Sequence, residues 1–124
     1  MSTRAHIKVE GEEVLIYKHS DGYPDGVHGV LAWLQPIVTR FVTERGSDEE
    51  YLLAQIIRQA AIQDYKKWLA EPEGKYKSRE PSLDPLGWGL GTSLHGDIEF
   101  LYVIKTDGKI EVHEGDFKKV LGKK

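Results

Sequence analysis

The stretch that decides the fold is residues 47–72, SDEEYLLAQIIRQAAIQDYKKWLAEP. Ser47 and Glu50 have the spacing of a helix capping box, in which each side chain accepts a hydrogen bond from the other residue's backbone N–H. Pro72 cannot continue a helix. Between them, apolar residues recur every three or four positions, as on one face of a helix: Leu53, Ile56, Ile57, Ala60, Ala61, Tyr65, Trp68 and Leu69. The stretch therefore predicts one long amphipathic helix.

A second helix is predicted immediately before the first. Its apolar stripe has the same period: Val27, Val30, Leu31, Leu34, Ile37, Val38, Phe41 and Val42. Asp25 is placed to act as its N-cap and Gly46 to end it. Pro36 interrupts the stripe, so the helix is expected to kink there or to restart with Pro36 in its first turn.

Strand patterns lie on both sides of the helical pair. Ile7 and Val9 alternate with polar residues, and residues 14–17 resume the strand after a turn near 10–13, which predicts an antiparallel hairpin. Residues 97–105 and 110–113 flank Asp107-Gly108, a strong hairpin turn. We therefore expect one α+β domain spanning residues 1–124: a four-stranded antiparallel sheet of two hairpins, with both helices on one face, in the order ββααββ. A short helical turn over 116–121 is expected to close it.

Residues 71–96 contain three prolines and five glycines and show no clear period. We expect 71–81 to be solvated and mobile because Tyr76 is its only large apolar residue. Residues 83–97 are expected to pack on the open face of the sheet or on a second subunit, because their apolar side chains would be costly to leave in water: Leu83, Leu86, Trp88, Leu90 and Leu94.

Composition narrows the classes of function. Seventeen basic residues against twenty acidic ones give a net charge of −3, which argues against a dedicated duplex-DNA binder. The chain has no cysteine, so disulfides and thiolate chemistry are excluded. No apolar run is long enough for a signal peptide or a membrane span, so we expect a cytoplasmic protein that does not bind membranes.

The first candidate site is the turn that holds His19, Asp21, Tyr23, Asp25 and His28. Imidazoles and carboxylates this close together could bind a divalent metal or act as acid and base. Asp21-Gly22 and Asp25-Gly26 are also common turn pairs, in which the carboxylate accepts hydrogen bonds from nearby backbone N–H groups. The structural explanation is simpler, and we expect no metal site, no cofactor and no catalytic residue here.

The second and third candidates lie further along the chain. Gly87-Trp88-Gly89-Leu90-Gly91 lacks the preceding strand and following helix that a dinucleotide-binding glycine loop requires. Trp88 could stack on a base or a partner, or it could fill the open face of the sheet. His95 and Asp97 could act as a pair, but no nucleophile elbow accompanies them.

Two of these segments together resemble an uncharacterised family of small proteins from bacteria, archaea and phage or prophage regions. The first is the turn His-x-Asp-Gly-Tyr-Pro-x-Gly after a strand, here residues 19–26; the second is a Gly-Asp-Ile-Glu-Tyr-type strand, here residues 96–100 with Phe100 in place of tyrosine. The resemblance spans about residues 4–112. It implies no activity, but it implies that both segments matter together, and a phage setting would favour an accessory protein over a metabolic enzyme.

No motif identifies a reaction or a target. The leading hypothesis is a non-enzymatic binding or interaction module, expected to form a homo-oligomer and to take a small molecule or a protein as partner. Its contact residues are His19, Asp21, Tyr23, Asp25, Trp88, His95 and Asp97. A small hydrolase acting on a phosphorylated or nucleotide ligand is the alternative. A single-stranded nucleic-acid binder using Trp88, Tyr76, Lys75 and Lys77 is a third, weakened by the net charge.

Overall fold

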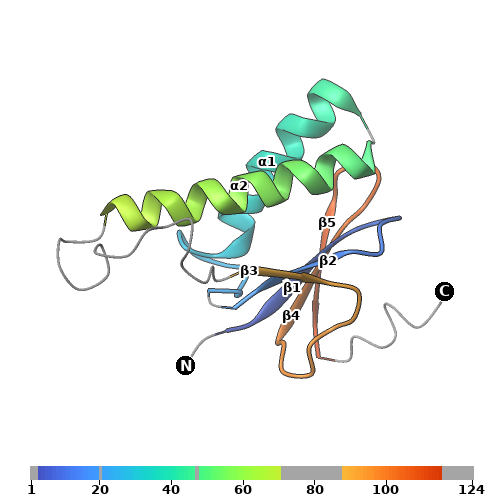
Figure 1. Cartoon of the computed structure of the whole chain (residues 1–124). Helices are drawn as coiled ribbons and strands as arrows, with labels where there is room; N and C mark the ends of the chain where they lie inside the picture. Colours follow the sequence, from blue (N-terminus) through green and yellow to red (C-terminus); the bar gives the residue numbers. More distant parts are fainter. Residues whose placement is uncertain (1–2, 20, 47, 71–87, 116–124) are drawn as a thin grey trace.

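The computed structural model describes residues 3–19, 21–46, 48–70 and 88–115, and these form an α+β fold. In chain order the elements are β1 (Ala5–Val9), β2 (Leu15–Lys18), α1 (Val30–Arg45), α2 (Glu49–Ala70), β3 (Trp88–Gly91), β4 (Phe100–Ile104) and β5 (Ile110–Glu114). Figure 1 shows the two helices lying on one side of the sheet. The predicted fold class and the helices on one face are therefore confirmed.

The sheet differs from the predicted one in strand number and direction. It has five strands in the order β3-β2-β1-β4-β5. Trp88–Gly91 is the additional strand, and it pairs antiparallel with β2 at an edge where glycines are tolerated. Both hairpins form as predicted, but β1 and β4 join them as a parallel pair, from Ala5↔Phe100 to Val9↔Ile104. The predicted all-antiparallel sheet and the order ββααββ are therefore wrong.

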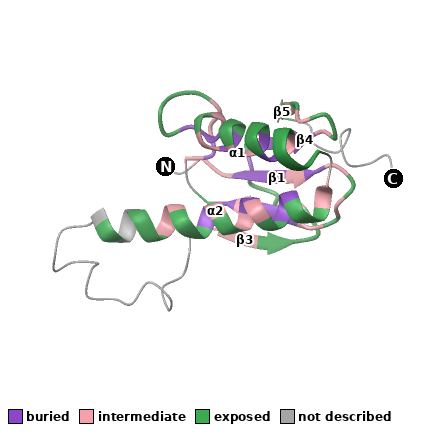
Figure 2. Ribbon diagram, turned by 90° about the horizontal axis from the view of Figure 1, so that it is seen from above, coloured by how far each residue is buried: buried purple, intermediate pink, exposed green. Residues whose placement is uncertain are grey.

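The main core lies between the sheet and the helices. The alternating residues Ala5, Ile7 and Val9 of β1 all point into it and are at most 1% exposed. Ile16 of β2 and Tyr102 and Ile104 of β4 extend the same surface. The helices complete it with one stripe each: Val30, Leu34, Val38 and Phe41 from α1 and Leu52, Leu53 and Ile56 from α2. Figure 2 marks buried residues on both helices and on the neighbouring strands.

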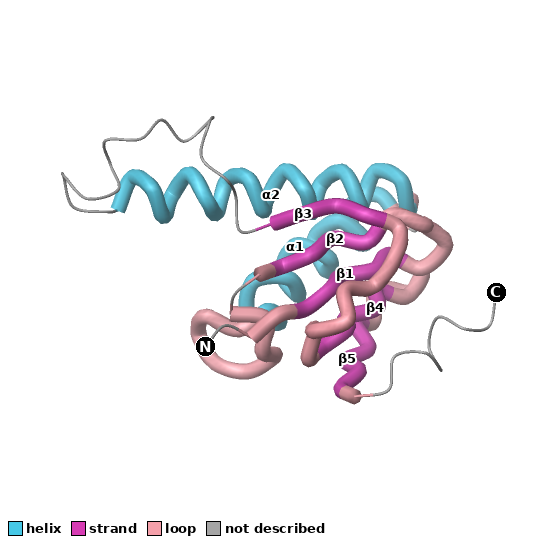
Figure 3. Tube along the Cα trace, turned by 60° about the horizontal axis from the view of Figure 1, so that its bottom comes forward, coloured by secondary structure: helices cyan, strands magenta, loops and turns pink. Residues whose placement is uncertain are grey.

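The opposite face of the sheet is covered by the loop between β3 and β4. To connect these two strands, residues 92–99 must cross β2 and β1, and Figure 3 shows them doing so on the side away from the helices. This second layer contains four buried apolar side chains that do not belong to the helix-side cluster: Leu15, Ile98, Leu101 and Val103. The predicted packing of the loop holds only in part: Leu94 is half-buried and His95 contacts the sheet, but the rest of 92–97 is exposed and Leu90 is 61% exposed.

The start of α1 differs from the prediction. The helix begins at Val30 with Gly29 as N-cap and no side-chain cap, so Asp25 is not its cap. Val27 is 87% exposed and does not belong to the stripe. The chain bends sharply here instead, because the Val30 N–H donates to the Tyr23 carbonyl. Gly46 ends α1 with φ 72°, as expected, but Pro36 lies inside one continuous helix, so α1 does not restart there.

Only the first part of α2 packs on the sheet. Ile62, Tyr65 and Leu69 are at least one-third exposed, so the predicted stripe is buried only as far as Ala60. Figure 3 shows the helix extending past the sheet. Within the described residues, neither helix combines the length and apolarity needed to cross a membrane. The expectations for Ser47, 71–81, Leu83, Leu86 and 116–121, and for Lys75, Tyr76 and Lys77, concern residues outside the described ranges.

Candidate functional site

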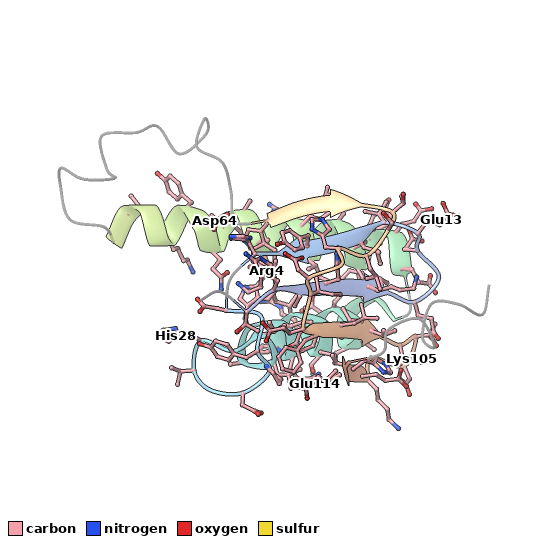
Figure 4. The ribbon with its side chains drawn as sticks, turned by 90° about the horizontal axis from the view of Figure 1, so that it is seen from below. Arg4, Glu13, His28, Asp64, Lys105 and Glu114 are labelled. Carbon is pink, nitrogen blue, oxygen red and sulfur yellow. The ribbon has the colours of Figure 1, made fainter. Side chains whose placement is uncertain are left out.

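One cross-strand row on the loop-covered face holds the chemically richest group of side chains. The pairing places Gly89, Tyr17, His6 and Leu101 side by side on four adjacent strands. His6 is 1% exposed and Tyr17 is half-buried. Because strand residues alternate between faces, this row lies opposite the helices, under the loop that contains His95. Figure 4 views this face of the sheet and shows the loop crossing it.

Four rings gather at this place, and we call them the ring cluster: His6, Tyr17, His19 and His95. The His95 ring stacks on Tyr17 with centroids 4.0 Å apart and planes at 13°. His6 meets the edge of His95 at 5.1 Å and lies 5.4 Å from Tyr17. The Tyr17 hydroxyl and His19 Nδ1 are hydrogen-bonded at 3.0 Å. His6 is thus the buried base of the cluster, while His19 and His95 are its exposed members.

His6 fixes the loop to the sheet through a hydrogen bond. The His95 backbone N–H donates to His6 Nε2 over 3.1 Å, so Nε2 is unprotonated and the neutral ring carries its proton on Nδ1. The pKa of His6 is lowered from 6.5 to about 4, mainly by burial and then by the neighbouring His95, while the Ile16 backbone and Asp97 act in the opposite direction. Nδ1 is buried and has no partner with hydrogen-bonding geometry among the described residues.

Residues 21–26 and 96–100 meet on either side of one short piece of chain, Thr3-Arg4. On one side, the Gly22 N–H donates to the Thr3 carbonyl over 2.9 Å. On the other side, the Glu99 N–H donates to the Arg4 carbonyl over 2.8 Å. The Arg4 side chain also pairs with Asp97, Nε to Oδ2, at 3.4 Å. Figure 4 labels Arg4 at this end of the sheet.

The turn of residues 21–29 is held by close backbone approach. A Cβ on Gly22 would lie 2.8 Å from both the Ala5 Cβ and the Thr3 carbonyl oxygen. The Tyr102 hydroxyl donates to the Gly22 carbonyl over 2.5 Å in a buried hydrogen bond. Burial raises the pKa of Tyr102, and the charge of Asp25 raises it further. Positive φ occurs at Gly26 (91°) and at Asp21 (56°), so of the glycines in the two turn pairs, Gly26 adopts the left-handed backbone and Gly22 does not.

The structure unites some of the predicted site residues and separates others. His19 and His95 both contact Tyr17, and Asp97 is close enough to affect His6. Asp21, Tyr23 and Asp25 belong to the adjacent turn.

Trp88 lies one row away on the opposite face of the sheet. Its ring is 5.2 Å from Trp33 of α1 and 4.6 Å from the Lys18 ammonium. The expectation that Trp88 fills the open face is therefore wrong, because its place in β3 turns it toward the helices.

Sequence reasoning missed His6, Tyr17 and Tyr102. Each lies in a strand whose pattern indicates burial, so none stood out as functional. The one available signal was His6 itself, a polar residue in a strand whose second face needs a covering layer.

In the described part of the chain, no three histidine, aspartate or glutamate side chains are grouped so that they could hold a metal ion. A hydrolase would take its metal ligands or general base from four polar residues: His19, Asp21, Asp25 and His95. The two histidines belong to the ring cluster, and the two aspartates belong to the turn. Comparisons with family models, curated proteins and solved structures gave no match.

Proposed function

We propose that the protein is a non-enzymatic binding module whose site is the end of the sheet where the ring cluster and the Gly22 turn meet. The observation that carries the proposal is the convergence of both segments on Thr3-Arg4. Two segments about 75 residues apart are held to the same two residues by backbone hydrogen bonds. Such a preorganised surface loses little conformational entropy when it binds a ligand.

The chemistry of the surface favours a partner that supplies a planar group. His95 lies flat on Tyr17 and is itself exposed, so a planar group of a partner can stack on the outer face of its ring. His19 and Asp97 are also exposed, and each has a second polar atom besides the one that contacts Tyr17 or Arg4. An aromatic side chain of a protein partner or a heterocyclic small molecule has the matching shape.

The hydrolase alternative has one observation in its favour. His19 and His95 bring two exposed imidazoles to the same tyrosine, and imidazole is the commonest acid–base catalyst in proteins. Among the described residues, no hydrogen bond or ion pair joins Asp21 or Asp25 to these two histidines, and the carboxylate of Asp97 is paired with Arg4. Binding is therefore the better-supported function.

The experiment is a two-dimensional NMR titration of the full chain with indole as the planar probe. We expect saturable shifts at His19, His95 and Asp97 with millimolar affinity, lost in His95→Ala and kept in His28→Ala, which removes an exposed histidine outside the cluster. Shifts that His95→Ala leaves unchanged, or no shifts, would overturn the proposal. Hydrolysis of p-nitrophenyl phosphate that is lost in His19→Ala would establish the hydrolase instead.

A further inference from the structure

A groove between α1 and α2 lies on the opposite side of the molecule from the ring cluster. Its volume is about 630 Å³. Three of its lining residues on α1 are spaced four and three apart (Ile37, Phe41, Glu44), and three on α2 have the same spacing (Tyr51, Gln55, Arg58). Residues at this spacing share one face of a helix, so each helix contributes one continuous face to the groove.

The groove concentrates arginine. The chain has five arginines, and three of them line the groove: Arg40, Arg45 and Arg58. None of its twelve lysines does so among the described residues. Within the described part of the chain, Glu44 is the one acidic residue of the lining, so the groove is positive in a chain of net charge −3. Arginine presents a planar fork of donors that fits phosphate oxygens in pairs, whereas lysine is a point charge.

The three guanidinium groups are available to an incoming anion. Arg40 pairs with Glu44 at 3.0 Å, and Arg45 pairs with Asp48 at 3.2 Å. All four side chains are more than one-third exposed, and ion pairs in water contribute little to stability. Arg58 is exposed and forms no ion pair within the described residues. An anion can therefore bind these guanidinium groups with little loss of free energy from the broken ion pairs.

The groove also offers surfaces for a ring. Phe41 is 8% exposed and forms part of the lining, with half-buried Ile37 beside it. Tyr51 is 57% exposed and carries the Arg45 guanidinium 4.5 Å above its ring. The amides of Gln55 and Gln59 line the α2 side and can both donate and accept hydrogen bonds.

We propose that this groove binds an organic polyphosphate of nucleotide size, with the phosphates on the three arginines and the planar group against Phe41 or Tyr51. Its volume lies within the range of about 300–1,000 Å³ that is usual for small-molecule sites. The site is separate from the ring cluster and does not depend on the function proposed there.

The test is calorimetric titration of the full chain with ATP, inorganic tripolyphosphate and adenosine. We expect ATP to bind most tightly, tripolyphosphate more weakly and adenosine weakest, with the ATP affinity falling as sodium chloride is raised. Arg58→Gln should weaken ATP binding about tenfold or more, since a charge-assisted contact is lost. Lys66→Gln removes the same charge from the same helix outside the groove and should change the affinity less than about twofold.

Three outcomes would overturn the proposal. Tripolyphosphate binding as tightly as ATP would show a plain anion site without ring recognition. Equal weakening by Arg58→Gln and Lys66→Gln would show a general charge effect. ATP binding that is lost in His95→Ala but kept in Arg58→Gln would place the ligand at the ring cluster. Unchanged melting temperatures of the variants confirm that each is folded, which is expected because Arg58 and Lys66 are exposed.

Discussion

Gly22 shows how a single missing side chain can hold two segments together. Its N–H reaches the Thr3 carbonyl because nothing stands between the two backbones, and a methyl group there would lie 2.8 Å from Ala5 Cβ. Gly26, four residues later, is needed for a different reason: its φ is 91°, and nothing lies within 4 Å of the Cβ position. The same residue type thus provides close approach at one position and a left-handed backbone at the other.

We predict that Gly22→Ala lowers the free energy of unfolding by roughly 2–3 kcal/mol, because the added methyl group overpacks a site closed by backbone. Gly96→Ala is the matched control: its Cβ would meet nothing within 4 Å, and its φ is not positive. Its effect should stay within about 0.5 kcal/mol. Urea denaturation followed by circular dichroism measures both. Equal stability of the two variants would contradict the role given to Gly22.

His6 makes stability depend on pH in a defined direction. Its pKa is about 4 in the folded protein and 6.5 in the unfolded chain, so between these values the unfolded state binds more protons. The contribution of neutral His6 to the free energy of unfolding is complete above pH 6.5 and is lost as the pH falls through about 4. The difference between the two pKa values of His6 corresponds to roughly 3 kcal/mol of unfolding free energy.

We therefore predict that the free energy of unfolding rises more steeply from pH 4 to 6.5 in the native protein than in His6→Gln, which keeps an acceptor but does not titrate. The comparison is necessary because Lys105 lowers the pKa of Glu10, which changes stability in the same direction. Urea denaturation at several pH values gives the two slopes. Parallel slopes, or an NMR titration that places the His6 pKa near 6.5, would refute the prediction.

Strand β4 both contributes to the core and holds the turn that follows β2. Tyr102 faces the helices, is 0% exposed and donates its hydroxyl hydrogen to the Gly22 carbonyl 80 positions earlier. The strand therefore carries part of the core and fixes the turn after β2. Immediately before the neighbouring β1, the Thr3 carbonyl accepts the Gly22 N–H of the same turn and the Arg4 carbonyl accepts the Glu99 N–H, so the two parallel central strands position the candidate site.

We predict that Tyr102→Phe costs about 1–2 kcal/mol, because the buried Gly22 carbonyl loses a neutral hydrogen bond. Hydrogen exchange at the Gly22 and Val30 amides should also accelerate, since both belong to the turn that Tyr102 holds. Tyr51→Phe is the control because Tyr51 is 57% exposed, and it should leave both measurements unchanged. Unaltered exchange in Tyr102→Phe would mean that the turn is held without this bond.

The molecule as a whole has three layers: helices, sheet and the 92–99 loop. The third layer exists because β3 and β4 are parallel and two strands lie between them, so the connection must cross the sheet. Ile98 is the loop residue that is buried, at 8% exposure. It lies on the side of Leu15, Leu101 and Val103, which would otherwise face water.

We predict that Ile98→Ala lowers the free energy of unfolding by roughly 2–4 kcal/mol, as for other buried isoleucines. The matched control is Ile62→Ala on α2, where the isoleucine is 37% exposed, and it should cost less than about 1 kcal/mol. Chemical denaturation again provides the measurement. Similar costs for the two variants would mean that the loop does not form a packed layer.

The sequence by itself determined the local elements. The two hairpins, the helical pair, the end of α1 at Gly46 and the turn at Asp107-Gly108 follow from periodicity and turn chemistry, which act over a few residues. His19, His95 and Asp97 were also found from their residue types. Trp88–Gly91 shows no strand pattern because Gly89 and Gly91 have low intrinsic strand preference, and only pairing with β2 makes this stretch extended.

Only the tertiary structure decided which residues meet. The parallel pairing of β1 with β4 joins segments about 95 residues apart, and no local pattern encodes that choice. It brings Tyr102 to Gly22, carries His95 over Tyr17 and makes His6 the buried base of the ring cluster. It also turns Trp88 to the helix side. The reason is physical: burial and hydrogen bonding between distant segments depend on the sheet order, which is set by the packing of the whole chain.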